Sequence, residues 1–317
     1  MSSSFAIARC TVRWALLTVL GLVLCGGAQA RAGTLLRWKF STGDSSKYTM
    51  TMTMRQEVTV NGMVIKTLMD QVVDYTWAIG SVNSDGTAAM SQTIDRVRME
   101  VKSAQGAQGQ TLKYDSADKE APTGLGAQLA PMMEALVGKA MTMRVTPRGE
   151  ISDFKVPEEM LAGFKKGPGM EQLGGIFSEQ GLKQMASQGM LKFPEEEVAT
   201  GDSWNTSVEI PNPILGTQKV VSAYTYAGTE NVDGQQLDKI ELKLDMKFEV
   251  PKDSPNQVDL KDQKTNGKIH FDNAMGRLID AENLSTIKME ITAGGMTIGS
   301  DVNTKATIKL NQGKKST

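Results

Sequence analysis

The sequence predicts a mainly antiparallel β fold with short helices, an α+β architecture in which one large curved sheet or half-barrel carries the helices on one face. Long segments alternate apolar and polar residues with the period of a strand, and two-residue turns join them. Helical spacing occurs only in the middle of the chain. The 317 residues, 40% hydrophobic and 22% charged, have the composition of a globular protein.

The first predicted hairpin covers residues 47–79 around Asn61-Gly62, a strong signal for a two-residue turn. Counting outward pairs Val60 with Met63 and Met54 with Met69. Because side chains alternate between the faces of a strand, one face becomes apolar and the other polar. The apolar face is predicted to carry Tyr48, Met50, Met52, Met54, Val58, Val60, Met63, Ile65, Met69, Val73, Tyr75 and Trp77.

Further strands extend this sheet. Residues 35–40 and 141–145 are predicted as short strands, 90–101 as a strand with one wet face, and 103–110 as a loop. In residues 240–250 apolar and polar side chains alternate without interruption, which predicts another strand with one apolar face.

A second two-residue turn, at Gly294-Gly295, closes another predicted hairpin. Counting outward from it pairs Ile291 with Ile298 and Ile287 with Val302, again with apolar residues on one face.

Three short amphipathic helices are predicted between these strands. The first lies near residues 125–138, with Pro131 in its first turn and Gly138 at its end. The second begins at Pro157 and stops at Gly167, and its apolar stripe consists of Met160, Leu161 and Phe164.

The third helix is predicted from Glu179 to Gly189, with Ser178 as its N-terminal cap. Leu182 and Met185 form its apolar side. Helices this short and amphipathic are expected to lie on the sheet rather than to form a separate bundle.

Short motifs recur along the chain. Gly43-Asp44-Ser45 returns as Gly201-Asp202-Ser203, and Tyr75-Thr76-Trp77-Ala78 returns as Tyr224-Thr225-Tyr226-Ala227. We interpret this as an internal duplication. The resulting division is a signal peptide (1–30), a first β-rich repeat (31–154), a helical segment (155–193), a second β-rich repeat (194–310) and a disordered tail (311–317).

The N-terminus has the pattern of a secretory signal. Arg9 and Arg13 precede an apolar run over residues 14–25, and Ala28-Gln29-Ala30 supplies the small residues that precede cleavage. About twelve apolar residues are too few for a membrane span, which needs about twenty. The sequence therefore predicts an exported protein, periplasmic or secreted. Lipid anchoring at Cys25 is the alternative, although the preceding Leu24 is larger than lipoprotein processing favours.

Cleavage after Ala30 removes both cysteines, two of the 35 basic residues and none of the 36 acidic ones. Disulfides, thiolate nucleophiles and cysteine-bound metals are thereby excluded from the mature chain. A weakly acidic chain without a basic block offers no footprint for nucleic acid.

No catalytic constellation is recognisable, so an enzyme, a cofactor and a metal site are not predicted. The single histidine, His270, is expected on the solvated face of its strand beside Lys268. Glu195-Glu196-Glu197 is read as a solvated turn.

Methionine is the one unusual feature, with 20 in the chain. Met50, Met52 and Met54 resemble the thioether sets that bind Cu(I). Alternation offers a simpler cause, since it places all of them on the apolar face. A methionine-lined sheet also suits variable apolar ligands.

On the leader, the hairpin, Thr93-Ile94-Asp95-Arg96-Val97, Thr146-Pro147-Arg148-Gly149-Glu150 and Gly201-Asp202-Ser203-Trp204, the chain resembles an exported bacterial family classed only as a domain of unknown function. The resemblance covers nearly all of residues 34–310. It implies export and β-structure and assigns no functional residue. A looser, architectural likeness is to periplasmic lipoprotein carriers, in which a curved sheet holds an apolar face against short helices.

The leading hypothesis is a non-enzymatic envelope protein that shelters an apolar or lipidic ligand between sheet and helices. A structural or protein-interaction module with a fully packed face is the alternative, and Met-based Cu(I) binding is the third reading. The ligand-binding residues predicted from the first hairpin and the helices are Tyr48, Met52, Met69, Tyr75, Trp77, Met132, Leu136 and Phe164.

Overall fold

The computed structural model describes residues 33–106, 108–120, 125–164, 178–212, 216–251, 254 and 256–311. The chain divides into two units, Met1–Ala32 and Gly33–Thr317, and every described residue belongs to the second. The predicted signal peptide and the predicted tail from residue 312 onward lie outside the described residues.

The described part of the second unit contains one twelve-stranded sheet and three helices. In chain order they are β1 (Ser45–Val60), β2 (Met63–Val82), β3 (Ala88–Gln105), β4 (Gln108–Asp115), α1 (Leu125–Leu136), β5 (Ala140–Val145), β6 (Ile151–Lys155), α2 (Glu158–Phe164), α3 (Glu179–Gly189), β7 (Ser203–Asn212), β8 (Gly216–Val232), β9 (Gln235–Glu249), β10 (Gln257–Asp272), β11 (Arg277–Ala293) and β12 (Met296–Leu310).

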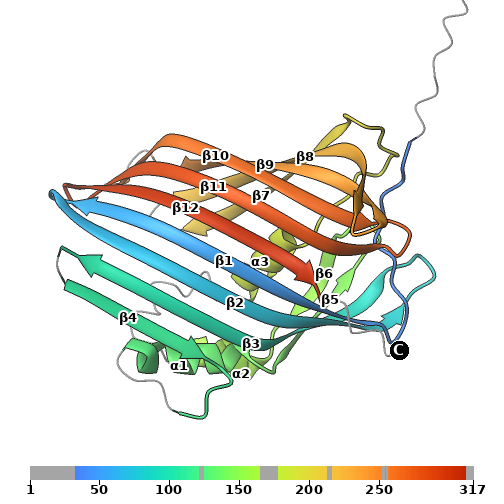
Figure 1. The fold of residues 1–317 in the computed structure, drawn as a ribbon, viewed down its shortest axis with the longest axis horizontal. Helices are drawn as coiled ribbons and strands as arrows, with labels where there is room; N and C mark the ends of the chain where they lie inside the picture. Colours follow the sequence, from blue (N-terminus) through green and yellow to red (C-terminus); the bar gives the residue numbers. More distant parts are fainter. Residues whose placement is uncertain are drawn as a thin grey trace, which may run out of the picture. The chain divides into compact units, whose positions relative to one another are not determined.

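The strand order is β6-β5-β3-β2-β1-β12-β11-β10-β9-β8-β7, and β4 pairs with β3 beside this path. All the strand pairs of the sheet are antiparallel, which confirms the predicted fold class. The first and last strands lie side by side at its centre, blue against red in Figure 1. Among the described strands β6 and β7 each have one neighbour, so the sheet is open.

The predicted hairpin registers are confirmed. Val60 opposes Met63 and Met54 opposes Met69. Asn61 and Gly62 both have positive φ, 50° and 79°, the geometry that matches the twist of a two-residue hairpin. In the last hairpin Ile291 opposes Ile298, as predicted.

Two predictions for the strands are wrong. Residues 35–40 form no strand; they are held by single contacts, such as the hydrogen bond that the Trp38 amide donates to the Pro147 carbonyl (2.8 Å). The predicted loop at 103–110 is a hairpin instead, because β3 continues to Gln105 and β4 starts at Gln108. Its Gln-, Gly- and Thr-rich composition conceals the strand, which gains its stability from pairing with β3.

The helices lie behind the sheet in Figure 1 and follow the predictions with two corrections. Ser178 caps α3, its Oγ accepting from the Gly181 amide at 3.1 Å. Pro131 lies inside α1 rather than in its first turn, because that helix begins at Leu125. Met185 of α3 is exposed, although it was expected on the apolar side. The predicted stop of the second helix at Gly167 lies outside the described residues.

An aromatic cluster packs around Trp38. Trp38 packs edge-on against Phe271 with ring centroids 5.1 Å apart, and its indole N–H donates to the Leu191 carbonyl at 2.8 Å. Gly149 lies against the same carbonyl with φ of 83°, and a Cβ there would be 2.2 Å from it. The strands are thus tied to the segments before β1 and after α3.

The repeated motifs form matching turns. The Gly43 amide donates to the Ile79 carbonyl and the Ile79 amide donates to the Asp44 carbonyl. In the second copy, Gly201 and Asp202 exchange the same two bonds with Tyr226. Both halves belong to one continuous sheet, and their common origin stays a prediction.

Candidate ligand-binding site

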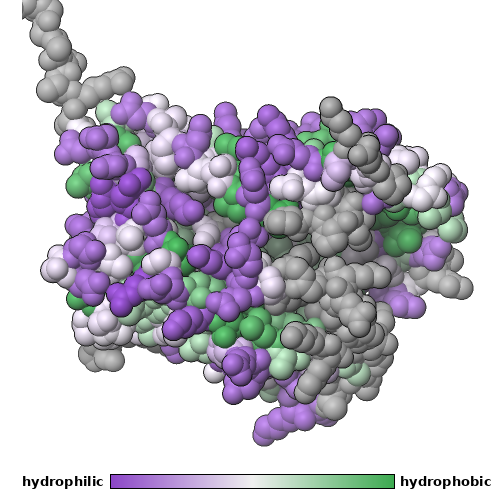
Figure 2. Space-filling view, turned by 180° about the vertical axis from the view of Figure 1, so that it is seen from behind, coloured by the Kyte–Doolittle hydropathy of each residue, from purple (hydrophilic) through white to green (hydrophobic). Residues whose placement is uncertain are grey.

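The sheet has two chemically different faces. The inner face, turned toward the helices, carries Tyr48, Met50 and the side chains aligned with them; the outer face carries Thr49 and the charged residues. The inner face is only partly covered, because Met52, Met54 and Leu244 are half-buried. Seen from the helix side, hydrophobic side chains reach the surface in several places between hydrophilic ones (Figure 2).

A cavity of about 260 Å³ lies on this inner face. Strands β8 to β12 and β1 supply most of its wall, and Trp38, Gly189 and Leu191 supply the side toward the helices. The other lining residues are Met50, Val220, Ser222, Tyr224, Leu242, Leu244, Ile269, Leu278, Ala281, Glu282, Asn283, Ala306 and Ile308. The site is therefore chiefly apolar and faces the interior.

Small residues meet at one side of this cavity. Ala306 of β12 opposes Asn283 of β11, and Asn283 opposes Gly267 of β10. Ala281, two positions before Asn283, is a third small residue on the same face. Ala281 lies between Ile308 and Ile269, so the short side chains of Ala281 and Ala306 leave room in the wall. The space over Gly267 is filled by the Leu242 side chain.

The sheet also splays beside the cavity. β10 pairs with β9 only over residues 267–271, although β10 itself starts at Gln257. Beyond Gly267 the side chain of Gln263 bridges the gap, donating to the Leu244 carbonyl and accepting from the Met246 amide, both at 3.0 Å. This bridge keeps β9 in place where backbone pairing has ended.

None of the eight ligand-binding residues predicted from the sequence lines this cavity. Tyr48, Tyr75 and Phe164 are buried in the core, and Met52, Met69, Trp77, Met132 and Leu136 are half-buried. Tyr48 stacks on Tyr75 with centroids 5.5 Å apart, and burial raises the pKa of both phenols. Five of the eight lie on β1 and β2 and three on α1 and α2, whereas the cavity faces mainly the other half of the sheet. The signal in the sequence was the small residues Ala281 and Ala306 at inner strand positions, although the pairing that brings them together is not local.

Two of the eight, Tyr48 and Trp77, line a separate cavity of about 230 Å³ near Phe40 and Arg277. The Trp77 indole N–H is buried there without a hydrogen-bond partner in the described part of the chain. Its wall mixes aromatic rings with Lys39, Asp44 and two serines.

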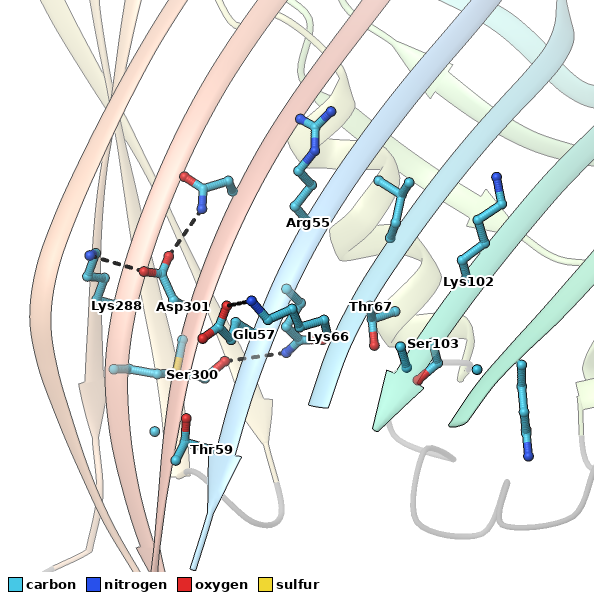
Figure 3. Close-up of a pocket in the computed structure, with 18 of the residues that line it drawn as sticks. Arg55, Glu57, Thr59, Lys66, Thr67, Lys102, Ser103, Lys288, Ser300 and Asp301 are labelled. Carbon is cyan, nitrogen blue, oxygen red and sulfur yellow. Dashed lines mark hydrogen bonds and ion pairs between the residues drawn. The ribbon is translucent and has the colours of Figure 1, made fainter. Parts of the chain in front are cut away.

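The outer face has a larger groove of about 1020 Å³, lined mainly by polar and charged residues of β1, β2, β3, β4, β10, β11 and β12 (Figure 3). Most of its charges already have partners. Lys66 pairs with Glu57 at 3.1 Å, and Lys288 pairs with Asp301 at 3.0 Å. Such exposed pairs leave little net charge for recognition of an anion.

The expectation that His270 is solvated is wrong. It lies on the outer face but is buried, with 3% of its surface exposed, rather than solvated. Its Nδ1 is 2.8 Å from Asp280 Oδ1, while its Nε2 has no hydrogen-bond partner among the described residues. No group of three or more potential metal ligands occurs within the described ranges.

A second buried polar pair lies nearby. The Tyr226 hydroxyl donates to Asp238 Oδ1 at 2.6 Å. Burial is the main cause that raises the pKa of Asp238, and the charge of Asp272 adds to it. Burial and the same hydrogen bond raise the pKa of Tyr226 to about 12.

No helix in the described residues is long and apolar enough to cross a membrane.

A family model described as a family of unknown function (DUF6263) matches residues 85–314. No curated protein matches the chain. Among solved structures, one that describes lipid–protein interactions in lipovitellin is 7% identical, with a TM-score of 0.45 over 86% of this chain and 26% of that chain. The chain thus spans about a quarter of the lipovitellin chain. A DUF1329 family protein from Desulfovibrio piger is 11% identical with a TM-score of 0.13, over 85% of this chain and 87% of that one.

Proposed function

The chain belongs to DUF6263, a family of unknown function, so we propose its role from the geometry of its own site. We propose that the protein binds an apolar, lipid-like ligand in the inner cavity and catalyses no reaction. The observation that carries the proposal is the cavity of about 260 Å³, whose wall is built chiefly from aliphatic and aromatic side chains. Apolar cavities stay dry and take up apolar molecules, because water cannot satisfy its hydrogen bonds there.

The size of the cavity limits the ligand. Pockets for drug-sized molecules measure roughly 300–1,000 Å³, so this one suits a single narrow hydrocarbon chain. Half-buried Met52 and Met54 continue the apolar surface along β1. A longer chain could extend over them, and each square ångström of apolar surface that it removes from water contributes roughly 25 cal/mol.

The test combines extraction of the native protein with mass spectrometry of the apolar molecules that copurify. Ala306→Leu should fill the hollow and strongly reduce the amount of bound material while the protein stays folded. Thr307→Leu adds the same side chain to the outer face of the same strand and should leave that amount unchanged.

Stability separates the proposal from a fully packed structural module. Added methylenes in a close-packed core cost about 1–3 kcal/mol, whereas a leucine placed in a real void costs little or stabilises. A destabilised Ala306→Leu variant, with no apolar molecule in the wild type, would favour the structural module.

We further propose that the protein acts outside the cytoplasm, on the strength of Arg9, Arg13, the apolar run and Ala28-Gln29-Ala30. The mature protein should begin at Arg31. Mass spectrometry of its N-terminal peptide tests this, and a lipid-modified Cys25 at the new N-terminus would contradict it.

A further inference from the structure

Among the described residues that line the apolar cavity, Asn283 is the one with an amide side chain. It lies in the middle of β11, opposite Gly267 on one neighbouring strand and Ala306 on the other. Along its own strand the next inner residues are Ala281 and Ser285. Asn283 therefore lies between two small residues of the neighbouring strands, and its side chain forms part of the cavity wall.

The amide oxygen is not satisfied by the described part of the protein. Asn283 Oδ1 is buried, and no donor in the described residues reaches it. Gln263, on the same face of β10, shows the contrast, because both ends of its amide bond the backbone of β9 at 3.0 Å. A buried polar atom without a partner is costly, so its retention in an apolar wall calls for a partner that binds there.

The charges around the cavity restrict what that partner can be. Within the described part of the lining, Glu282 is the only residue of the Asp, Glu, Lys, Arg or His type. Its carboxylate pairs with Lys305 on the outer face at 2.8 Å. No lysine, arginine or histidine occurs among the lining residues that the structure describes, so none of them receives an anion. An ionised head group would lose its hydration without gaining an opposite charge.

We propose that the ligand is a neutral apolar molecule bearing a hydroxyl group, of the long-chain alcohol type, whose hydroxyl bonds the Asn283 amide. A hydroxyl can donate to Asn283 Oδ1, the atom without a partner, whereas an ether oxygen and a carboxylate cannot donate. Ser222, on the β8 side of the same cavity, offers a second hydroxyl for a ligand with two polar groups. This inference rests on the proposed function and adds the chemical class of the ligand.

Three probes of equal chain length test it on the full chain after removal of copurified lipid: 1-decanol, decyl methyl ether and decanoate near neutral pH. Binding is followed by calorimetry, or by the fluorescence of Trp38, which lines the cavity. The alcohol should bind roughly three- to tenfold more tightly than the ether, the factor that one neutral hydrogen bond supplies. Decanoate should bind more weakly than the alcohol.

Variants assign the preference to the amide. Asn283→Leu should bind the ether about as well as the wild type and lose the preference for the alcohol. Asn283→Ala, which keeps the space open, should show the same loss if the leucine variant folds poorly. Asn303→Leu removes an amide from the outer face of β12 and should keep the preference.

Equal affinities for alcohol and ether in the wild type, or a preference that survives Asn283→Ala, would overturn the inference and leave apolar binding intact. If none of the three probes binds, the proposed function fails as well. The two failures are therefore distinguishable.

Discussion

His270 Nδ1 lies 2.8 Å from Asp280 Oδ1 across the β10–β11 pair, and the imidazole is 3% exposed although it stands on the outer face of the sheet. Lys239, the cross-strand neighbour of His270 on β9, forms an ion pair with Glu230 at 2.9 Å. His270 Nε2 is 3.7 Å from the same Glu230 carboxylate. Charged side chains thus surround His270, and we interpret its role in this position as structural.

Asp280→Ala should destabilise the protein by about 1–3 kcal/mol, because it leaves the buried Nδ1 of His270 without its partner. Urea unfolding measures the loss. The control is Glu282→Ala on the same strand and face, which removes an exposed pair with Lys305 and should cost less than about 1 kcal/mol. Equal losses of unfolding free energy in the two variants would show that the His270–Asp280 hydrogen bond stabilises the fold no more than an exposed ion pair does.

Leu244→Asp should unfold the protein or lower its stability by at least about 1–3 kcal/mol, because it places a carboxylate in the apolar wall of the cavity. Lys243→Asp, one residue earlier on the outer face, should stay within about 0.5 kcal/mol of the wild type. Thermal melting of both variants makes the comparison. Matching melting temperatures would contradict the assignment of faces on β9.

Asp238→Asn tests the buried pair with Tyr226 through its pH dependence. Since burial raises the folded pKa of Asp238 above its ordinary 3.8, the carboxyl favours folding at acid pH, and that stability is lost as the pH rises through the folded pKa. Asparagine keeps the acceptor for the Tyr226 hydroxyl and cannot ionise.

The stability of Asp238→Asn relative to the wild type should therefore increase from about pH 4 to about pH 7. Denaturant unfolding at several pH values measures it. A relative stability that falls over this range would mean that the ionised carboxylate is favoured in the folded state.

Replacing Met50, Met52 and Met54 together by leucine should leave the fold intact and change copper binding little, because leucine keeps the volume of the inner face. The measurement is competition for Cu(I) against a chelator. Tight Cu(I) binding by the wild type that disappears in the triple variant would support the alternative that these methionines bind Cu(I).

The sequence by itself determined the local features of this protein. The hairpin register at Asn61-Gly62 follows from turn chemistry and alternation, which involve residues close in the chain. The cap of α3 by Ser178 is likewise local. The alternating faces of β9 could be read directly, because the period of a strand depends on no partner.

Only the tertiary structure decided where the cavity lies. It depends on the pairing of β10, β11 and β12, which brings Gly267, Asn283 and Ala306 into one row, and on the segment around Leu191 that covers them. The pairing of β1 with β12 joins the two ends of the described chain, and no local pattern specifies such a contact. The burial of His270 has the same origin, since Asp280, Lys239 and Glu230 come from three other strands. Alternation assigns a face to each side chain, but only packing between distant strands decides whether that side chain is covered, exposed or set beside a void.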